Sequence, residues 1–324
     1  MLRREFLGGL GATALAAGHF RPAWAEVAAS WPDRPVKLIL PYAPGGATDQ
    51  LGRPWAEALS KAFGQQFVIE NRGGASGLIG TEAAAKSPPD GYTFLVSPNS
   101  TITLLPFLRQ VGYDPKSFEP VARVGDLVAG FVIHPSVGVK TFKEMIEYAK
   151  KNPGKLVYGS SGQGTSNALR LETLKYRAGI DILHVPYRGS ADALNDLLPG
   201  TVQMMNEIII YPHVKAGKLV LLAISHSSRA PDFPDVPTLT ELGYPNSDVP
   251  IWYSILAPAG TPKDIIAKLN AKVVEIARTD EMKARMRSIN VEVPLQTPDE
   301  IRVFLAADAH GNTELIKATN YKAE

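Results

Sequence analysis

Short apolar runs alternate along the chain with longer stretches in which apolar residues recur every three or four positions. Residues 36–40 form the first run, which is apolar and partly β-branched, and predict a buried strand. In residues 50–63 the apolar side chains fall on one face of a helix. Because this alternation continues along the chain, it predicts an α/β protein with mixed, mostly parallel sheets flanked by helices.

The same pattern predicts the remaining elements. Pro54, inside the first helix, predicts either a kink or a regular helix that begins only there. Further strands are expected at residues 66–70, 92–96, 129–134, 156–158, 182–185, 201–205, 219–225 and 252–257. Further helices are expected at residues 78–86, 142–151, 168–178, 191–198, 264–277, 281–289 and 298–317.

A glycine-rich loop, residues 41–49, joins the first strand to the first helix. Gly45 and Gly46 let the backbone approach a ligand closely, and Thr48 or Asp49 can cap the helix. The first N–H groups of a helix carry partial positive charge, so the loop suits a carboxylate or a phosphate. An ordinary capped turn is the alternative.

A second loop, residues 159–167, repeats this design in the other half of the chain, with Thr165 in the place of Thr48. Two loops suited to anions, in two halves of the sequence, suggest the two walls of one cleft. The polar turn at residues 97–101 follows another strand, at the carboxyl end where open α/β sheets hold ligands.

Composition narrows the class of protein. The 324 residues are 45% hydrophobic and 20% charged, which suits two domains or one large one. The net charge is +2 and no basic run occurs, so no nucleic-acid partner is expected. The chain contains no cysteine, which excludes disulfides, thiolate metal sites and cysteine nucleophiles.

The N-terminus has the pattern of an export signal. Residues 3–7 read Arg-Arg-Glu-Phe-Leu, a small-residue apolar segment follows, and residues 23–25 have the Ala-x-Ala form of a cleavage site. The arginine pair resembles a twin-arginine signal, and a Sec signal or an N-terminal anchor are the alternatives. We expect cleavage after Ala25 and a soluble protein in the periplasm.

The motifs of several enzyme classes do not occur. The chain lacks Gly-x-Ser-x-Gly, a Walker A motif and a complete Gly-x-Gly-x-x-Gly. Its histidines lack metal-ligand spacing and its acidic residues form no catalytic pair, so neither a metal nor a cofactor is expected. An exported hydrolase that uses Ser161 or Ser166 is a poor alternative, because the sequence offers no obvious base.

Seven motifs, spread over essentially the whole mature chain, carry a family resemblance. They are residues 41–49, 70–72, 89–93, 185–190, 216–219, 235–238 and 257–262. In type and order they resemble the Bug family, the extracytoplasmic receptors of tripartite tricarboxylate transporters. So many ordered motifs make the resemblance specific.

The resemblance implies a two-domain, hinged periplasmic binding protein (type II, Venus-flytrap), not an enzyme, which closes on its ligand. Domain 1 would comprise residues 26–124 plus 247–324, and domain 2 residues 125–246. The implied partners are a small carboxylate and the membrane permease subunits of such a transporter. A monomer is expected.

The resemblance also implies a set of ligand-binding residues. They are Tyr42, Ala43, Gly46, Thr48, Asp49, Asn99, Ser161, Gly162, Thr165 and Ser166. Asp49 would repel a bare carboxylate, so its carboxyl group is assigned to capping or to holding a water molecule. Arg188, where the family often has Lys, is either a clamp for a second carboxylate or a charge at the rim.

Several positions depart from the family pattern. Ile102, Leu105 and Ala168 stand where polar residues are common, and Gln203 replaces a usual Asp. Residues 206–208 replace a Phe-Asp-Asn-like run, and Asn206 is a further candidate ligand residue. If these positions face the pocket, they favour a carboxylate with an apolar body, such as an aromatic dicarboxylate, over citrate. If they face the core, they say nothing about the ligand.

A receptor that delivers its ligand to a transporter is therefore the first hypothesis. A co-receptor that presents its ligand to a sensor kinase would have the same sequence features, so this alternative stays open.

Overall fold

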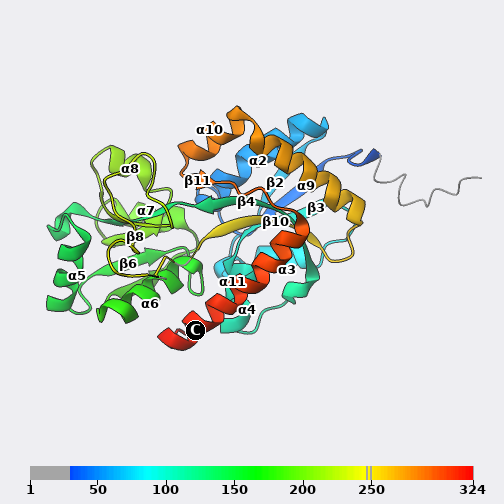
Figure 1. The fold of residues 1–324 in the computed structure, drawn as a ribbon. Helices are drawn as coiled ribbons and strands as arrows, with labels where there is room; N and C mark the ends of the chain where they lie inside the picture. Colours follow the sequence, from blue (N-terminus) through cyan, green and yellow to red (C-terminus); the bar gives the residue numbers. More distant parts are fainter. Residues whose placement is uncertain (1–29, 246, 249, 324) are drawn as a thin grey trace, which may run out of the picture.

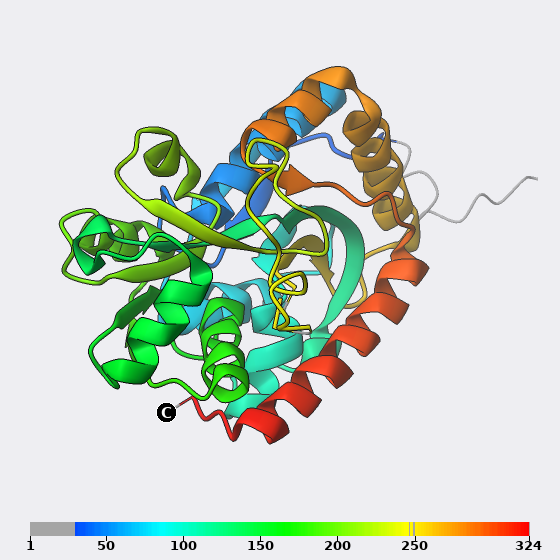
Figure 2. The same cartoon turned by 60° about the vertical axis from the view of Figure 1, so that its left-hand side comes forward.

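The computed structural model describes residues 30–245, 247–248 and 250–323. Within these ranges the strands form two sheets, each the centre of its own lobe (Figures 1 and 2). The expected signal peptide and its cleavage site fall in residues 1–25, outside the described residues.

The first lobe is built on a six-stranded sheet with the strand order β11-β4-β10-β3-β1-β2. β1, β2 and β3 are parallel to one another, whereas β10 is antiparallel to β3 and β4, and β11 is antiparallel to β4. The bounds are β1 (Val36–Leu40), β2 (Phe67–Asn71), β3 (Thr93–Pro98), β4 (Phe118–Leu127), β10 (Trp252–Pro258) and β11 (Val291–Glu292).

Helices cover both faces of this sheet, which explains why Leu38, Ile39 and Leu40 of β1 are consecutive apolar residues. Leu38 and Leu40 belong to the large core shared with α2 (Ala47–Phe63) and α9 (Lys263–Arg278). Ile39, which points the other way, belongs to a smaller core with α3 (Leu78–Ala85). α10 (Asp280–Ser288) packs beside α9 and α2.

The second lobe is built on a five-stranded sheet with the order β7-β6-β8-β5-β9. β6 is parallel to β7 and β8, and β5 is antiparallel to β8 and β9. The bounds are β5 (Ala129–Ile133), β6 (Val157–Ser160), β7 (Leu183–Pro186), β8 (Met204–Glu207) and β9 (Val220–Ser225). The helices of this lobe are α5 (Phe142–Lys151), α6 (Ser166–Ala178), α7 (Ser190–Leu197) and α8 (Tyr211–Lys215).

The chain crosses between the sheets twice. A single residue, Val128, separates β4 from β5, and the chain returns between the end of β9 and the start of β10. The predicted domain boundaries, at 124/125 and 246/247, stay a prediction. α11 (Pro298–Thr319) adds a third link, because it contacts β4 of the first lobe and α6 of the second (Figure 2).

Several elements differ from the sequence prediction. α2 begins at Ala47, three residues early, and runs through Pro54 as one helix, so the alternative of a regular helix that begins only at Pro54 is wrong. The ten-residue strand β4 was not predicted, because only its pairing with the distant β10 makes that stretch a strand. After β3 the predicted polar turn is a π-helical turn, Ser100–Leu104, followed by the short helix α4 (Leu105–Leu108).

Candidate functional site

A cavity of about 20 Å³ lies between the two lobes. It is enclosed where β1 and β3 end on one side and where β6, β7 and β8 end on the other. This volume holds about one water molecule. The lobes therefore stand closed, and they must separate to admit a ligand of several carbon atoms.

Three helices begin at the wall of this cavity. The residues that line it include, from these helix starts, Gly46, Ala47 and Thr48 of α2, Thr165, Ser166 and Asn167 of α6, and Gly189, Ser190 and Ala191 of α7. The first N–H groups of a helix have no partner inside the helix and carry partial positive charge. Three such starts around one cavity favour a bound anion.

The first loop is held from behind by Asp49, which does not line the cavity. Its carboxylate accepts hydrogen bonds from the Gly45 N–H (3.0 Å), from Arg53 Nε (2.8 Å) and from Asn71 Nδ2 (3.2 Å). Burial raises the pKa of Asp49, but the hydrogen bonds from Arg53, Gly45 and Asn71 outweigh burial and leave the pKa below its usual value. The charged form of Asp49 thus fixes the loop.

The predicted side-chain cap of α2 is wrong. The N-cap residue is Gly46, with no side-chain hydrogen bond to the helix. The Thr48 hydroxyl lies instead 3.2 Å from the Tyr253 hydroxyl, which also lines the cavity. The role of cap falls to the other lobe, because the Ala47 N–H donates to Ser190 Oγ at 3.2 Å.

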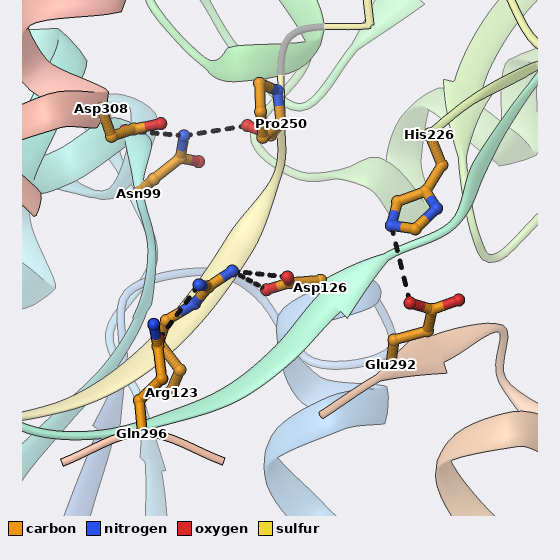
Figure 3. Close-up of polar contacts among 8 residues, drawn as sticks. All are labelled: Asn99, Arg123, Asp126, His226, Pro250, Glu292, Gln296 and Asp308. Carbon is orange, nitrogen blue, oxygen red and sulfur yellow. Dashed lines mark hydrogen bonds and ion pairs between the residues drawn. The ribbon is translucent and has the colours of Figure 1, made fainter. Parts of the chain in front are cut away.

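A second hydrogen bond between the lobes involves Asn99. Its Oδ1 accepts from Ser166 Oγ at 2.9 Å. Its Nδ2 donates to the carbonyl of Pro250 at 3.0 Å and to Asp308 Oδ2 at 3.3 Å, and these two contacts orient the amide (Figure 3). Asn99 therefore lies just outside the cavity, where it joins the lobes.

The second loop has the predicted cap. Thr165 is the N-cap of α6 and accepts from the Ala168 N–H at 3.4 Å, while its hydroxyl donates to the Gly162 carbonyl at 2.7 Å. Gly162 has a φ of +138°, which favours glycine. The Ser161 hydroxyl donates to Asn167 Oδ1 at 3.1 Å.

The structure thus brings together most of the predicted site. Tyr42, Ala43, Gly46, Thr48, Ser161, Thr165 and Ser166 line the cavity. Asn99 and Gly162 contact the lining residues Ser166 and Thr165 from behind, and Asp49 binds the first loop at Gly45. Arg188 is exposed and does not line the cavity, and Asn206 is buried with its Oδ1 bonded to Arg170.

Sequence reasoning missed several polar side chains of the wall. They are Ser100, Asn167, Ser190, Asp192, Glu207 and Tyr253. Ser190 carried a usable signal, because it follows a glycine at a helix start in one of the family motifs. Glu207 belongs to the run 206–208 that departs from the family pattern, whereas Tyr253 lies within a strand that no local pattern marks as ligand-facing.

Glu207 is the most enclosed acid of the wall, with 3% of its surface exposed. Its Oε1 accepts from Asn167 Nδ2 at 3.3 Å and its Oε2 from the Ile208 N–H at 3.2 Å. Burial raises the pKa of Glu207 to about 7, although these hydrogen bonds and the charge of Arg170 act against the rise.

A polar cluster lies where the chain crosses between the lobes. Arg123, on β4, pairs with Asp126 and donates to Gln296 Oε1 at 3.1 Å. His226, which follows β9 of the second sheet, has its Nε2 3.9 Å from the carboxylate of Glu292 on β11 of the first sheet (Figure 3). Of these contacts, the one between His226 and Glu292 joins the two sheets.

The described residues contain no group of three or more His, Cys, Asp or Glu side chains that could hold a metal ion. Within the same ranges, no helix is both long enough and apolar enough to span a membrane.

Comparison with known proteins agrees with this architecture. The sequence pattern of the tripartite tricarboxylate transporter family receptors matches residues 51–321. This chain belongs to that receptor family. It is 34% identical to the protein BugT of Bordetella pertussis over 300 residues, which cover 90% of this chain and 91% of BugT.

Two solved receptors extend the similarity to structure. Rpa4515 of R. palustris, solved with adipate, is 33% identical with a TM-score of 0.87, covering 90% of this chain and 99% of that one. MatC of Rhodopseudomonas palustris, solved with malate, is 28% identical with a TM-score of 0.82, covering 88% of this chain and 100% of that one. The predictions of the Bug family, of a two-lobed α/β binding-protein fold and of a receptor rather than an enzyme are confirmed. Receptors of this family are periplasmic.

The two serines that a hydrolase would use are hydrogen-bonded to amide side chains. Ser161 and Ser166, considered as nucleophiles, donate to Asn167 and Asn99. Just before the second loop, Ser160 contacts a histidine, with its Oγ 2.6 Å from His184 Nε2. Ser160 also accepts from the Gly162 N–H, so this pair supports the second loop from below.

Of the residues that motivated an apolar ligand, only Glu207, itself an acid, lines the receptor's cavity. Ile102 lies in the core beside β1 and β3, and Ala168 lies in a small core near the C-terminus. Leu105 is wholly buried, and Gln203 binds backbone groups of its own lobe. The preference for a carboxylate with an apolar body over citrate stays a prediction, without support from these positions.

Proposed function

We propose that this receptor captures a small dicarboxylate between its two lobes in the periplasm. The observation that carries the proposal is the convergence of the starts of α2, α6 and α7 on one enclosed cavity. Backbone N–H groups and hydroxyls hold an anion without transforming it. The adipate and malate bound to Rpa4515 and MatC support the same ligand class.

The capture follows from closure about a hinge. Residues 26–124 plus 247–324 form one moving body and residues 125–246 the other, as the sequence analysis predicts. In the open state the N–H of Ala47, the first of α2, loses its partner Ser190, and closure places Ser190 and Ser166 against the first lobe. The ligand contacts are the cavity-lining residues, with Asp49, Asn99 and Gly162 as supports.

The closed receptor, a monomer exported by its N-terminal signal, delivers its ligand to the membrane subunits of a tripartite tricarboxylate-type transporter. The family description supports this partner.

A ligand panel tests the proposal. The mature protein is unfolded by heat in the presence of adipate, malate, terephthalate, benzoate or citrate. A ligand at 100 times its dissociation constant stabilises the folded state by about 2.7 kcal/mol, which gives a clear shift in Tm. We expect a dicarboxylate to bind. If none of the five shifts the Tm, the proposed function is wrong, and tighter binding of citrate than of terephthalate or benzoate would end the aromatic hypothesis.

A pair of threonine variants locates the site. Thr165 caps α6 at the cavity, and Thr279 caps α10 outside it. Thr165→Ala and Thr279→Ala should each cost about 1 kcal/mol of stability, because each removes one N-cap. Only Thr165→Ala should also weaken the ligand, since Thr165 holds the carbonyl of Gly162 in the second loop. Equal ligand affinity in the two variants would place the site elsewhere.

A further inference from the structure

The wall of the ligand cavity contains acids and no cation. Asp192 and Glu207 line it, and no Lys, Arg or His of the described ranges does so. Asp192 is exposed to solvent, whereas Glu207 is enclosed by protein. A dicarboxylate that enters this cavity therefore meets a buried carboxyl group without a counter-charge in the wall.

Two carboxylates that face each other in an enclosed site cannot both stay ionised at low cost. They share a site readily when one proton lies between them, with one carboxyl group as donor and the other as acceptor. The hydrogen bonds that Glu207 already accepts, from Asn167 and Ile208, leave lone-pair and O–H directions for such a contact.

We propose that Glu207 is a specificity-determining residue of this receptor, which binds the ligand in its protonated form and donates its O–H to a carboxylate oxygen of the ligand. The inference rests on the proposed function and adds to it. In the step, no covalent bond between heavy atoms changes. One proton from solvent joins Glu207 as the ligand enters, and capture of each dicarboxylate takes up as much as one proton.

The groups around Glu207 decide its charge together. Those that act on it, or that feel its charge, are Arg170 of α6, Tyr158 of β6, Tyr42 after β1 and Tyr253 of β10. Arg170 favours the ionised form, but it is itself wholly buried, and its guanidinium donates to Asn206. Burial is the larger influence on Glu207 and raises its pKa to about 7. A ligand carboxylate nearby would raise this pKa further.

Because binding takes up a proton, the affinity for the ligand depends on pH. The ligand binds the protonated form, so affinity is full below pH 7 and falls as the pH rises above it, by roughly tenfold per pH unit. Between pH 6 and pH 9 the dissociation constant of adipate should therefore rise about a hundredfold. Ligands that carry only one carboxylate should show the same trend only if that carboxylate meets Glu207.

Calorimetry on the wild-type receptor tests this directly. Adipate is titrated at pH 6 and pH 9, in two buffers of different ionisation enthalpy at each pH, so that protons taken up on binding are counted. We expect that each adipate bound takes up close to one proton at pH 9 and much less than one proton at pH 6. Glu207→Gln, which always donates a hydrogen bond, should bind adipate with the same affinity at both values.

Glu172→Gln is the matched control. Glu172 lies on α6 and pairs with Lys175 at 3.1 Å, outside the cavity. This variant should keep the pH dependence of the wild type. Equal adipate affinity at pH 6 and pH 9 without proton uptake, or affinity that rises with pH, would overturn the role of Glu207 while the receptor function stands. If no dicarboxylate of the panel binds at any pH, both the function and this inference fall.

Discussion

At the scale of single residues, the enclosure of one acid has a consequence for stability in the ligand-free receptor. Glu207 keeps its proton in the folded protein up to about pH 7, whereas the unfolded chain releases it near pH 4.5. The folded state thus binds more protons between these values. Its stability from this group is full below pH 4.5 and is lost as the pH rises through 7.

The first prediction uses this window. Since one pKa unit corresponds to 1.36 kcal/mol, the wild type should lose about 3 kcal/mol relative to Glu207→Gln between pH 4.5 and pH 8. Urea unfolding of both proteins across this range measures the difference. Glu172→Gln should follow the wild-type curve. Parallel curves for the wild type and Glu207→Gln would mean that Glu207 stays ionised in the folded protein.

At the scale of elements, helix starts in one lobe meet side chains of the other. Ser190, at the start of α7, accepts from the first N–H of α2, and Ser166, at the start of α6, donates to Asn99. The loops of the two lobes are thereby complementary even without a ligand. Each such bond contributes about 1 kcal/mol.

The second prediction removes both bonds. A Ser166→Ala, Ser190→Ala double variant should shift the balance of closed and open forms by about 2 kcal/mol, or roughly thirtyfold, toward the open form. The chain has no cysteine, so spin labels at Lys61→Cys and Lys150→Cys, one exposed site in each lobe, report the distance between the lobes. We expect longer distances in the double variant.

Ser288→Ala is the control for this measurement, because Ser288 lies at the end of α10 and its hydroxyl donates to the Arg285 carbonyl of its own turn. It should leave the distances unchanged. Unchanged distances in the double variant as well would show that contacts other than these two hold the lobes together.

How far the sequence predicts the structure also depends on scale. α9 was predicted at 264–277 and spans Lys263–Arg278, because its apolar face is a local pattern. The two glycine loops were equally local, and both border the cavity. β4 was missed because its strand character depends on β10, which follows more than a hundred residues later.

The site was predictable where it lies on loops and not where it lies on strands. Thr165 and Ser166 stand at a capped helix start that the sequence displays. Glu207 ends a four-residue strand, and Tyr253 lies in an apolar one, so only the approach of the two lobes makes them part of the wall. Ile102 and Ala168 show the converse, since positions polar in relatives need not face the ligand here.

At the scale of the whole molecule, the C-terminal segment ties the first lobe to the ligand loop of the second. α11 packs along β4, and the chain beyond it places the Tyr321 hydroxyl 2.8 Å from the N–H of Gly164. The Tyr321 ring packs with Leu104 of the first lobe and with Ala168 and Leu169 of the second. The segment therefore contacts both lobes when they are closed.

The third prediction separates the hydrogen bond of Tyr321 from its packing. Tyr321→Phe keeps the ring and leaves the buried Gly164 N–H without its acceptor in the closed form, at a cost of roughly 1–3 kcal/mol. If the segment stays with the first lobe as the receptor opens, this cost falls on closure, and the dissociation constant for adipate should rise by at least about fivefold and at most roughly 150-fold. Tyr148→Phe, on α5 and away from the cavity, should leave it unchanged. If Tyr321→Phe lowers the Tm but leaves adipate affinity as it was, the segment instead moves with the second lobe, and the bond contributes equally to the open and the closed form.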